Sequence, residues 1–115
     1  MNKIRLVINN ETQKKDKEKF FIKKELQSIL NLYAKMVSNG SWKDYSFTSG
    51  IKEVSFNVYQ RASEKPVLRI LKNLKPKYFN EKYLIKDTNG AILKKSESLS
   101  RLIDKTSWNK LRLVK

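Results

Sequence analysis

The sequence contains neither cysteine nor histidine, and it has only three glycines and two prolines. Without cysteine there is no disulfide framework and no thiolate metal site. Without histidine the commonest general base and a usual ligand of transition metals are missing as well. The glycines form no phosphate-binding loop, and the 11 carboxylates are scattered among lysines, with no pair at a spacing typical of a glycosidase or nuclease. We therefore expect a protein that is not an enzyme and that holds no cofactor and no metal.

Long apolar runs are absent too. No stretch approaches the ~18–20 apolar residues that a membrane-spanning helix requires. The opening MNKIRLVI starts close to a basic residue, but its apolar part is too short for a secretory signal. These absences predict a cytoplasmic protein without a membrane span. A chain of 115 residues with 39% hydrophobic side chains is enough for one folded domain.

The sequence is strongly basic. The 26 lysines and arginines outnumber the 11 aspartates and glutamates, so the formal net charge is +15. A polyanion is therefore the first partner to consider, whether RNA, DNA or an anionic membrane surface. The alternative is compositional drift, because an AT-rich genome favours lysine, asparagine and isoleucine codons. Drift explains lysine better than arginine, and only five of the basic residues are arginine.

Residues 1–19 are predicted to form a flexible basic arm, with a short strand at IRLVI near its start. The stretch NNETQKKDKEK alternates in charge and has no apolar residue. A solvated linker and an arm that becomes ordered on a partner are both consistent with this composition. Residues 20–115 are predicted to form a single α+β domain.

The clearest periodic signal lies in residues 21–39, where apolar residues recur at steps of three and four. This spacing predicts a helix whose apolar stripe packs on the core. The stripe consists of Ile22, Leu26, Ile29, Leu30, Tyr33 and Val37. Asn39-Gly40 is a helix stop, because glycine accepts the left-handed conformation.

Short runs with a period of two follow, and they predict strands. The runs are residues 42–47, 53–61, 67–74, 82–87 and 91–95. Asn89-Gly90 joins the last two as a hairpin turn. Residues 96–106 predict a second, shorter helix, capped by Ser96 or Ser98. The predicted fold is α+β, an antiparallel meander sheet of about five strands with an N-terminal helix and a shorter C-terminal helix packed on one face.

The alternation also assigns side chains to the two faces of the sheet. In the run 53–61, apolar residues alternate with polar ones, so Asn57, Tyr59 and Arg61 are predicted to share the outer face. A hairpin to the next strand places Arg69 on that face, opposite either Asn57 or Tyr59. Arginine offers a planar fork of donors and stacks on rings, which lysine cannot do. A tyrosine beside arginines on an open sheet is typical of proteins that bind single-stranded nucleic acid.

A structural role for the same residues stays open, because the second helix can cover Tyr59 and ion pairs can hold the arginines. The possible pairs are Arg61 with Glu64, and Arg69 with Glu53 or Asp44. Further basic residues are expected to add charge around the sheet: Lys72, Lys75, Lys77, Lys82, Lys94, Lys95 and Arg101. Lysines of this kind contact phosphates without reading sequence. Trp42 and Trp108 are predicted to close the core rather than to stack on bases.

Four stretches of the chain are long enough to be distinctive: LQSILNLYAKMVSNGSWKDYSF, FNVYQRASEKPVLRILK, NGAILKKSESLSRLI and KLRLVK. Together they resemble a small, single-domain alphaproteobacterial family of unknown function, over roughly residues 20–115. The resemblance implies a bacterial cytoplasmic protein, or one of organelle ancestry, and it implies no activity. The phrase R-A-S-E-x-P-x-x-R-I belongs to the family pattern. It draws attention to Arg61, Ser63, Glu64 and Arg69 without separating a structural turn from a binding site.

These observations predict a non-enzymatic nucleic-acid-binding domain, with RNA or another single strand favoured over duplex DNA. No pattern of a helix-turn-helix, zinc finger or basic zipper is present to enter a major groove. Association with the ribosome or with transcription is one use for such a module. The alternative is a protein-interaction module that docks an acidic partner or serves as a subunit of a larger complex. A peripheral membrane role ranks lowest, because the amphipathic helix is expected to cover the core.

Overall fold

The computed structural model describes residues 19–61 and 65–108. The elements in chain order are α2 (Lys23–Ser38), β1 (Asp44–Ser49), β2 (Glu53–Tyr59), β3 (Leu68–Asn73), the 3-10 turn η1 (Phe79–Glu81), β4 (Tyr83–Asp87), β5 (Ile92–Ser96) and α3 (Leu99–Lys105). All strands and both helices overlap their predicted ranges, so the α+β prediction is confirmed. The predicted arm, apart from Lys19, and its strand at IRLVI lie outside the described residues.

The strands form one antiparallel sheet in the order β1-β2-β3-β4-β5, so each strand pairs with its neighbours in the sequence. The predicted turn at Asn89-Gly90 joins β4 to β5, and Gly90 takes a φ of 89° there. The Asp87 carboxylate accepts hydrogen bonds from the amides of Asn89 at 3.0 Å and Ala91 at 2.9 Å. A meander of this kind leaves β1 and β5 as the two edges of the sheet.

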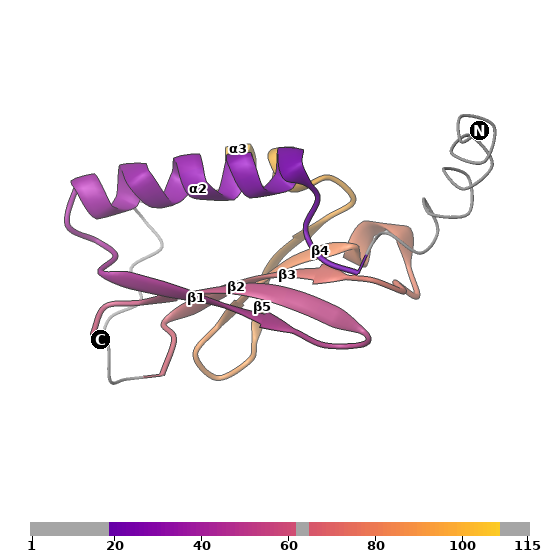
Figure 1. Ribbon diagram of the computed structural model, residues 1–115. Coiled ribbons are helices and arrows are strands. Elements are labelled where there is room, and N and C mark those ends of the chain that lie inside the picture. The colour runs from indigo at the N-terminus through magenta and orange to yellow at the C-terminus, as the bar shows by residue number, and fades with distance from the viewer. Residues whose placement is uncertain (1–18, 62–64, 109–115) are drawn as a thin grey trace, which may run out of the picture.

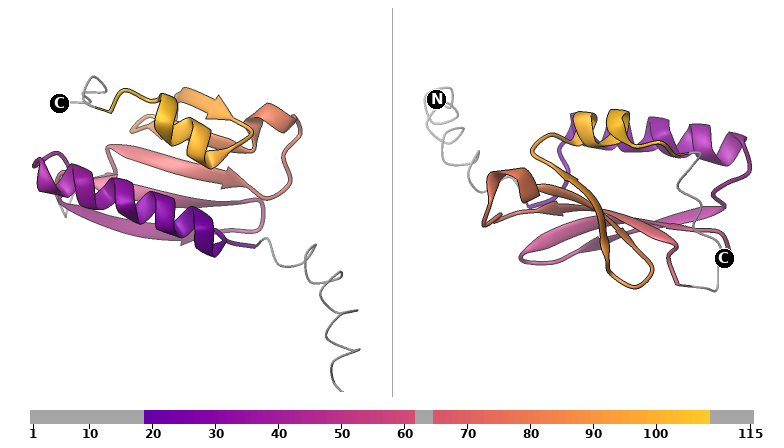
Figure 2. Two further views of the ribbon diagram at one scale, coloured as in Figure 1. Left: turned by 90° about the horizontal axis from the view of Figure 1, so that it is seen from above. Right: turned by 180° about the vertical axis from the view of Figure 1, so that it is seen from behind.

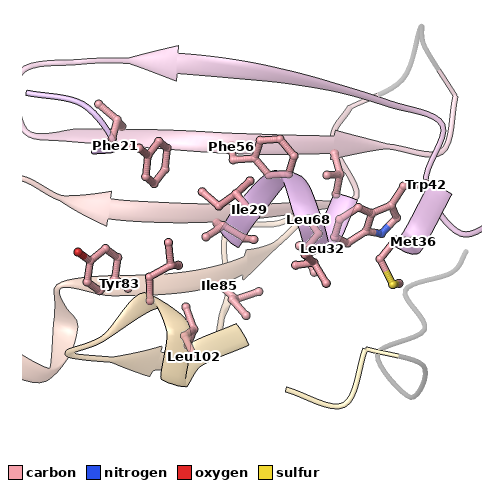
Figure 3. Close-up of a cluster of buried hydrophobic side chains, with 14 residues drawn as sticks. Phe21, Ile29, Leu32, Met36, Trp42, Phe56, Leu68, Tyr83, Ile85 and Leu102 are labelled. Atoms are coloured by element: carbon pink, nitrogen blue, oxygen red, sulfur yellow. The ribbon is translucent and has the colours of Figure 1, made fainter. Parts of the chain in front are cut away.

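Both helices lie over the same face of the sheet (Figure 1). Seen from above, α2 and α3 run side by side, with α2 over the β1–β2 side and α3 over the β4–β5 side (Figure 2). The core fills the space between the two layers. Side chains of α2, of the strands and of α3 converge there, among them Ile29, Phe56 and Ile85, which are all fully buried (Figure 3). We call this side the covered face and the other side the open face.

The buried side of α2 differs from the predicted stripe. Ile29 is buried as expected, but the other fully inward apolar residues are Leu32 and Met36. Three members of the predicted stripe are exposed: Ile22 at 44%, Leu30 at 40% and Val37 at 40%. The apolar surface of α2 is therefore wider than its contact with the sheet, and the prediction is wrong about which edge of it faces inward.

The physical reason is Glu25, which precedes Ile29 by one helical step and lies on the same inward side. Its Oε1 accepts hydrogen bonds from the Ile22 amide at 2.8 Å and from Lys72 Nζ at 2.9 Å. Its Oε2 accepts from the Tyr83 hydroxyl. Lys72 also donates to the Phe20 carbonyl at 3.1 Å. This polar cluster ties the start of α2 to β3 and β4, and thereby sets the rotation of the helix.

Both tryptophans close one end of the core, as predicted. Trp42 is 5% exposed, and its ring lies 5.8 Å from that of Trp108, perpendicular to it. The Trp108 indole donates to the Ile103 carbonyl at 3.0 Å. Ser98 caps α3 by accepting from the Arg101 amide at 3.3 Å, so of the two predicted caps it is Ser98 that acts.

Candidate nucleic-acid interface

The open face is formed by the side chains that alternate with the core residues of β2 and β3. Because Val54, Phe56 and Val58 are buried in the core, Asn57 and Tyr59 point the other way. Neither α2 nor α3 reaches this side of the sheet (Figures 1 and 2). The predicted placement of these two residues on one face is confirmed.

Asn57 is held in a network of polar side chains on the open face. Its Nδ2 donates to Ser46 Oγ at 3.1 Å and to Thr48 Oγ1 at 3.0 Å. Its Oδ1 accepts from Ser55 Oγ at 2.9 Å. Asn57 is only 3% exposed, and its neighbour Ser55 is buried as well. The amide is therefore occupied by the sheet itself, and its role is to stabilise β1 against β2.

Tyr59 lies at the margin of this network. Its hydroxyl is 3.0 Å from Ser46 Oγ, and the ring is half-buried on the open face. The second helix does not cover it, because α3 lies on the other face (Figure 2). The ring is consequently fixed in direction by its hydroxyl and remains in part accessible.

Arg69 faces a second cation. Arg69 lies directly opposite Asn57 on β2, which is one of the two predicted registers. On its other side it lies directly opposite Lys86 on β4. Arg69 and Lys86 are both half-exposed, and with the described residues neither forms an ion pair or a side-chain hydrogen bond. The alternative pairs with Glu53 or Asp44 are thus not formed. Like charges directly opposite each other in a sheet are destabilising, so this pair places positive charge on the open face that no described acid balances.

The register explains why no acid reaches Arg69. Asp44 pairs with Tyr59 at the far edge of β2, and Glu53 pairs with Asn73 at the opposite end of β3. Arg61 is exposed just beyond the end of β2. The predicted alternative for it, a pair with Glu64, lies outside the described residues.

Lys72 is not on the surface, and its predicted place in a nucleic-acid site is wrong. It alternates with Arg69 and Leu71 along β3, so it points into the covered face. The side chain is fully buried, with its ammonium on Glu25 at 2.9 Å. A charged lysine is buried at tolerable cost only beside a partner of this kind. The alternation places Lys72 on the face of Leu68 and Ile70, but lysine is normally assigned to solvent.

The remaining predicted basic residues fall in different places. Arg101 lies on α3, over the covered face, and pairs with Glu97 at 3.7 Å. Lys94 and Lys95 are exposed on β5, where Lys95 reaches Glu81 at 3.5 Å. The other three, Lys75, Lys77 and Lys82, follow β3 at the end of the sheet away from Arg69. The basic surface is therefore divided rather than continuous.

Sequence reasoning missed three side chains. Lys86 shares the open face with Arg69, and the alternation of the run 82–87 was the signal for it. Tyr78 and Phe79 are among the most exposed aromatic residues of the described chain and directly follow a Lys-Pro-Lys stretch. Two adjacent exposed rings indicate a contact surface more strongly than a single exposed ring does.

The described residues hold no group of acidic side chains that fits a metal ion. Their helices include none with the length and apolar character needed to cross a bilayer. A hollow of about 400 Å³ lies between α2 and α3, lined in part by Lys35, Asp104 and Trp108. It belongs to the helical layer and not to the open face.

Comparison with known proteins agrees with the predicted resemblance. No curated protein and no solved structure matches the chain. A family model described as a protein of unknown function, DUF2794, matches residues 19–103, which is most of the chain and nearly all of the described fold. The chain belongs to this family of proteins of unknown function.

Proposed function

We propose that the protein is a non-enzymatic nucleic-acid-binding domain that takes single strands, RNA foremost, on the open face of its sheet. The observation that carries the proposal is the Arg69–Lys86 pair, in which two cations oppose each other and no described carboxylate balances them. A bound phosphate relieves their repulsion, because it supplies the negative charge that the described residues do not place beside the pair.

The two cations supply different chemistry. The Arg69 guanidinium is a planar fork that can hold two oxygens of one phosphate, whereas the Lys86 ammonium acts as a point charge. The half-buried ring of Tyr59 lies one strand away on the same face and offers a surface for a base. A sheet face that neither helix covers suits unpaired strands better than a major groove does. In this account the protein works in the cytoplasm of an alphaproteobacterium.

The test is binding of a fluorescent mixed-sequence single-stranded RNA, measured by anisotropy. The variant Arg69→Gln/Lys86→Gln is expected to bind at least about a hundredfold more weakly, since it loses two contacts and each charged contact to phosphate is worth ~1.5–3 kcal/mol. The matched control is Lys35→Gln/Lys105→Gln, which removes the same charge from exposed positions of the helical layer. Equal losses in the two variants would mean that only net charge matters, and the proposal would fail.

Arg69→Lys separates the fork from the charge. We expect weaker RNA binding although the net charge is unchanged, because an ammonium cannot form the bidentate contact. Arg61→Lys is the companion variant, at an exposed position beyond β2. If both variants bind like the parent, the planar geometry of arginine has no role.

A second candidate function is a protein-interaction surface along β1 and α2. Leu30, Val37 and Tyr45 are each 40% exposed there, beside strand β1, which within the described residues pairs on one side only. The test uses immobilised parent and Leu30→Ser/Val37→Ser chains with an RNase-treated bacterial lysate. A protein that the parent and the Arg69→Gln/Lys86→Gln variant retain, and that the serine variant loses, would support docking at this edge. A protein lost only by the Arg69→Gln/Lys86→Gln variant would count against it.

A further inference from the structure

The three most exposed large hydrophobic residues of the described chain gather at one end of the sheet. They are Ile51 at 85%, Phe79 at 73% and Tyr78 at 57% exposed. Ile51 lies in the turn between β1 and β2, and the two aromatics lie in the connection between β3 and β4. Both connections are at the same end of the molecule, opposite the β4–β5 hairpin (Figure 1). Scattered single apolar residues need no explanation, but three at one end do.

The two connections are fastened to each other and to the sheet. The Leu74 amide donates to the Lys52 carbonyl at 2.9 Å, which joins the turn to the end of β3. The Asn73 amide donates to the Lys82 carbonyl at 2.7 Å, and the Asn73 side chain donates to the Glu81 carbonyl. These hydrogen bonds fix the backbone of the two connections, so the exposed side chains already point outward. The connections therefore need not refold when a partner binds.

Lysines surround these apolar side chains. Lys52, Lys75 and Lys77 are exposed in the same two connections, and Lys77 Nζ lies 5.8 Å from the centre of the Tyr78 ring. Of the nearby acids, Glu81 reaches Lys95 at 3.5 Å and Glu53 is half-buried at the start of β2. We call Ile51, Lys52, Lys75, Lys77, Tyr78 and Phe79 the sheet-end tip.

We propose that the sheet-end tip docks the protein on an anionic lipid bilayer. Ile51, Tyr78 and Phe79 would enter the boundary between headgroups and acyl chains, and the lysines would meet the headgroup phosphates. Aromatic rings with a polar end favour this boundary. Ile51 decides between a bilayer and a nucleic acid, because an aliphatic side chain has no π-face on which a base can stack. The tip lies at the other end of β3 from Arg69, so the inference does not depend on RNA binding.

The test is co-sedimentation of the full chain with vesicles of neutral phosphatidylcholine, and with vesicles in which about a third of the lipid is anionic phosphatidylglycerol. We expect binding to the anionic vesicles alone. Phe79→Ser is expected to lower the partition coefficient about tenfold. The burial of a phenylalanine side chain away from water favours the bound state by at least that factor, and serine lacks this contribution. Lys52→Gln, Lys75→Gln and Lys77→Gln are each expected to lower it about fivefold.

Ile51→Ser and Ile92→Ser form a matched pair. Ile92 is 51% exposed on β5, next to the hairpin at the far end of the sheet. Ile51→Ser is expected to weaken vesicle binding, and Ile92→Ser is expected to leave it unchanged. Thermal unfolding of each variant checks that the fold is retained, which these exposed positions predict.

A second readout detects insertion itself. Phe79→Trp is expected to be quenched by vesicles that contain brominated acyl chains, beyond the quenching of the parent, and Ile92→Trp is not. Absence of binding to anionic vesicles, equal binding to neutral ones, or unchanged binding by Phe79→Ser would overturn the proposal. So would tip variants that bind vesicles normally but lose the single-stranded RNA, which would make the tip a site for stacking bases.

Discussion

Strand β3 carries a cation on each face of the sheet. Lys72 points into the covered face, where it is fully buried and paired with Glu25. Arg69 points to the open face, where it is half-exposed and meets another cation, Lys86. The two residues lie on one short strand, in the same local backbone, yet one is neutralised by the fold and the other is not.

The difference separates charges that the fold requires from charges that it merely tolerates. A buried ammonium without a partner costs several kcal/mol, so Lys72 persists only with its carboxylate. A half-exposed guanidinium is solvated by water and needs no partner, so nothing in the fold demands an arginine at position 69. The fold therefore does not require the open-face pair, and in the proposed function an external anion balances its charge. The comparison can be broken or sharpened by changing each face in turn.

The largest effect is expected from Lys72→Met. Removing the ammonium leaves the Glu25 carboxylate buried and unpaired, which is expected to cost about 3–5 kcal/mol of unfolding free energy. Arg69→Met, on the same strand, is expected to change it by no more than about 0.5 kcal/mol. Urea unfolding of both variants measures the contrast. Similar losses would show that the two cations are structurally equivalent.

The double variant Glu25→Gln/Lys72→Met tests the cause of that loss. It removes the uncompensated charge while keeping a side chain whose oxygen can accept from the Ile22 amide and whose NH2 group can donate to the Tyr83 hydroxyl. We expect it to regain part of the stability that Lys72→Met loses. No recovery would mean that the lysine acts through packing of its methylenes instead.

An intermediate effect is expected from Asn57→Ala on the open face. Asn57 is nearly as buried as the core and satisfies hydroxyls on β1 and β2, so its loss is expected to cost about 1–3 kcal/mol. RNA affinity at a temperature well below unfolding is expected to stay within about twofold, because the amide is buried and already bonded to hydroxyl groups of the sheet. A large loss of affinity without loss of stability would return Asn57 to the binding site.

The smallest effect on stability, with the opposite sign, is expected from Lys86→Glu. It converts the like-charged pair with Arg69 into an ion pair, which is expected to add about 0.2–1 kcal/mol to the unfolding free energy. RNA binding is expected to fall in the same protein. Lys94→Glu, on the neighbouring strand and exposed, is the control for the charge change. A variant that is both less stable and fully able to bind would contradict the assignment.

The sheet was largely predictable, because apolar and polar residues alternate along its strands. Val54, Phe56 and Val58 alternate with polar residues, and that alone places Asn57 across from Arg69 in one of two registers. The Asn89-Gly90 turn needs positive φ, which few other residues provide, so the last hairpin was predictable as well. Both helices also fall where their apolar periodicity placed them.

The polar core was not predictable in the same way. Leu68, Ile70 and Lys72 follow one another on a single face, and Glu25 continues the spacing of Ile29, but charged residues are normally solvated and pattern rules assign them outward. The two charged side chains can be buried because Glu25 and Lys72 form an ion pair in the folded protein, and the sequence does not show that they come together. The same ion pair rotates α2 and exposes Leu30 and Val37. The sheet-end tip escaped notice for a related reason, because its residues come from two connections far apart in the sequence.

The account is tested most directly by the salt dependence of single-stranded RNA affinity in the parent chain and in Arg69→Gln/Lys86→Gln. Each phosphate contact contributes about 0.7 to the slope of log affinity against log salt concentration. If two contacts are lost, the slope of the variant is expected to be shallower by about 1.4. Parallel lines for the two proteins, or no binding by the parent at physiological salt, would contradict the claim that the open face holds nucleic acid through these two cations.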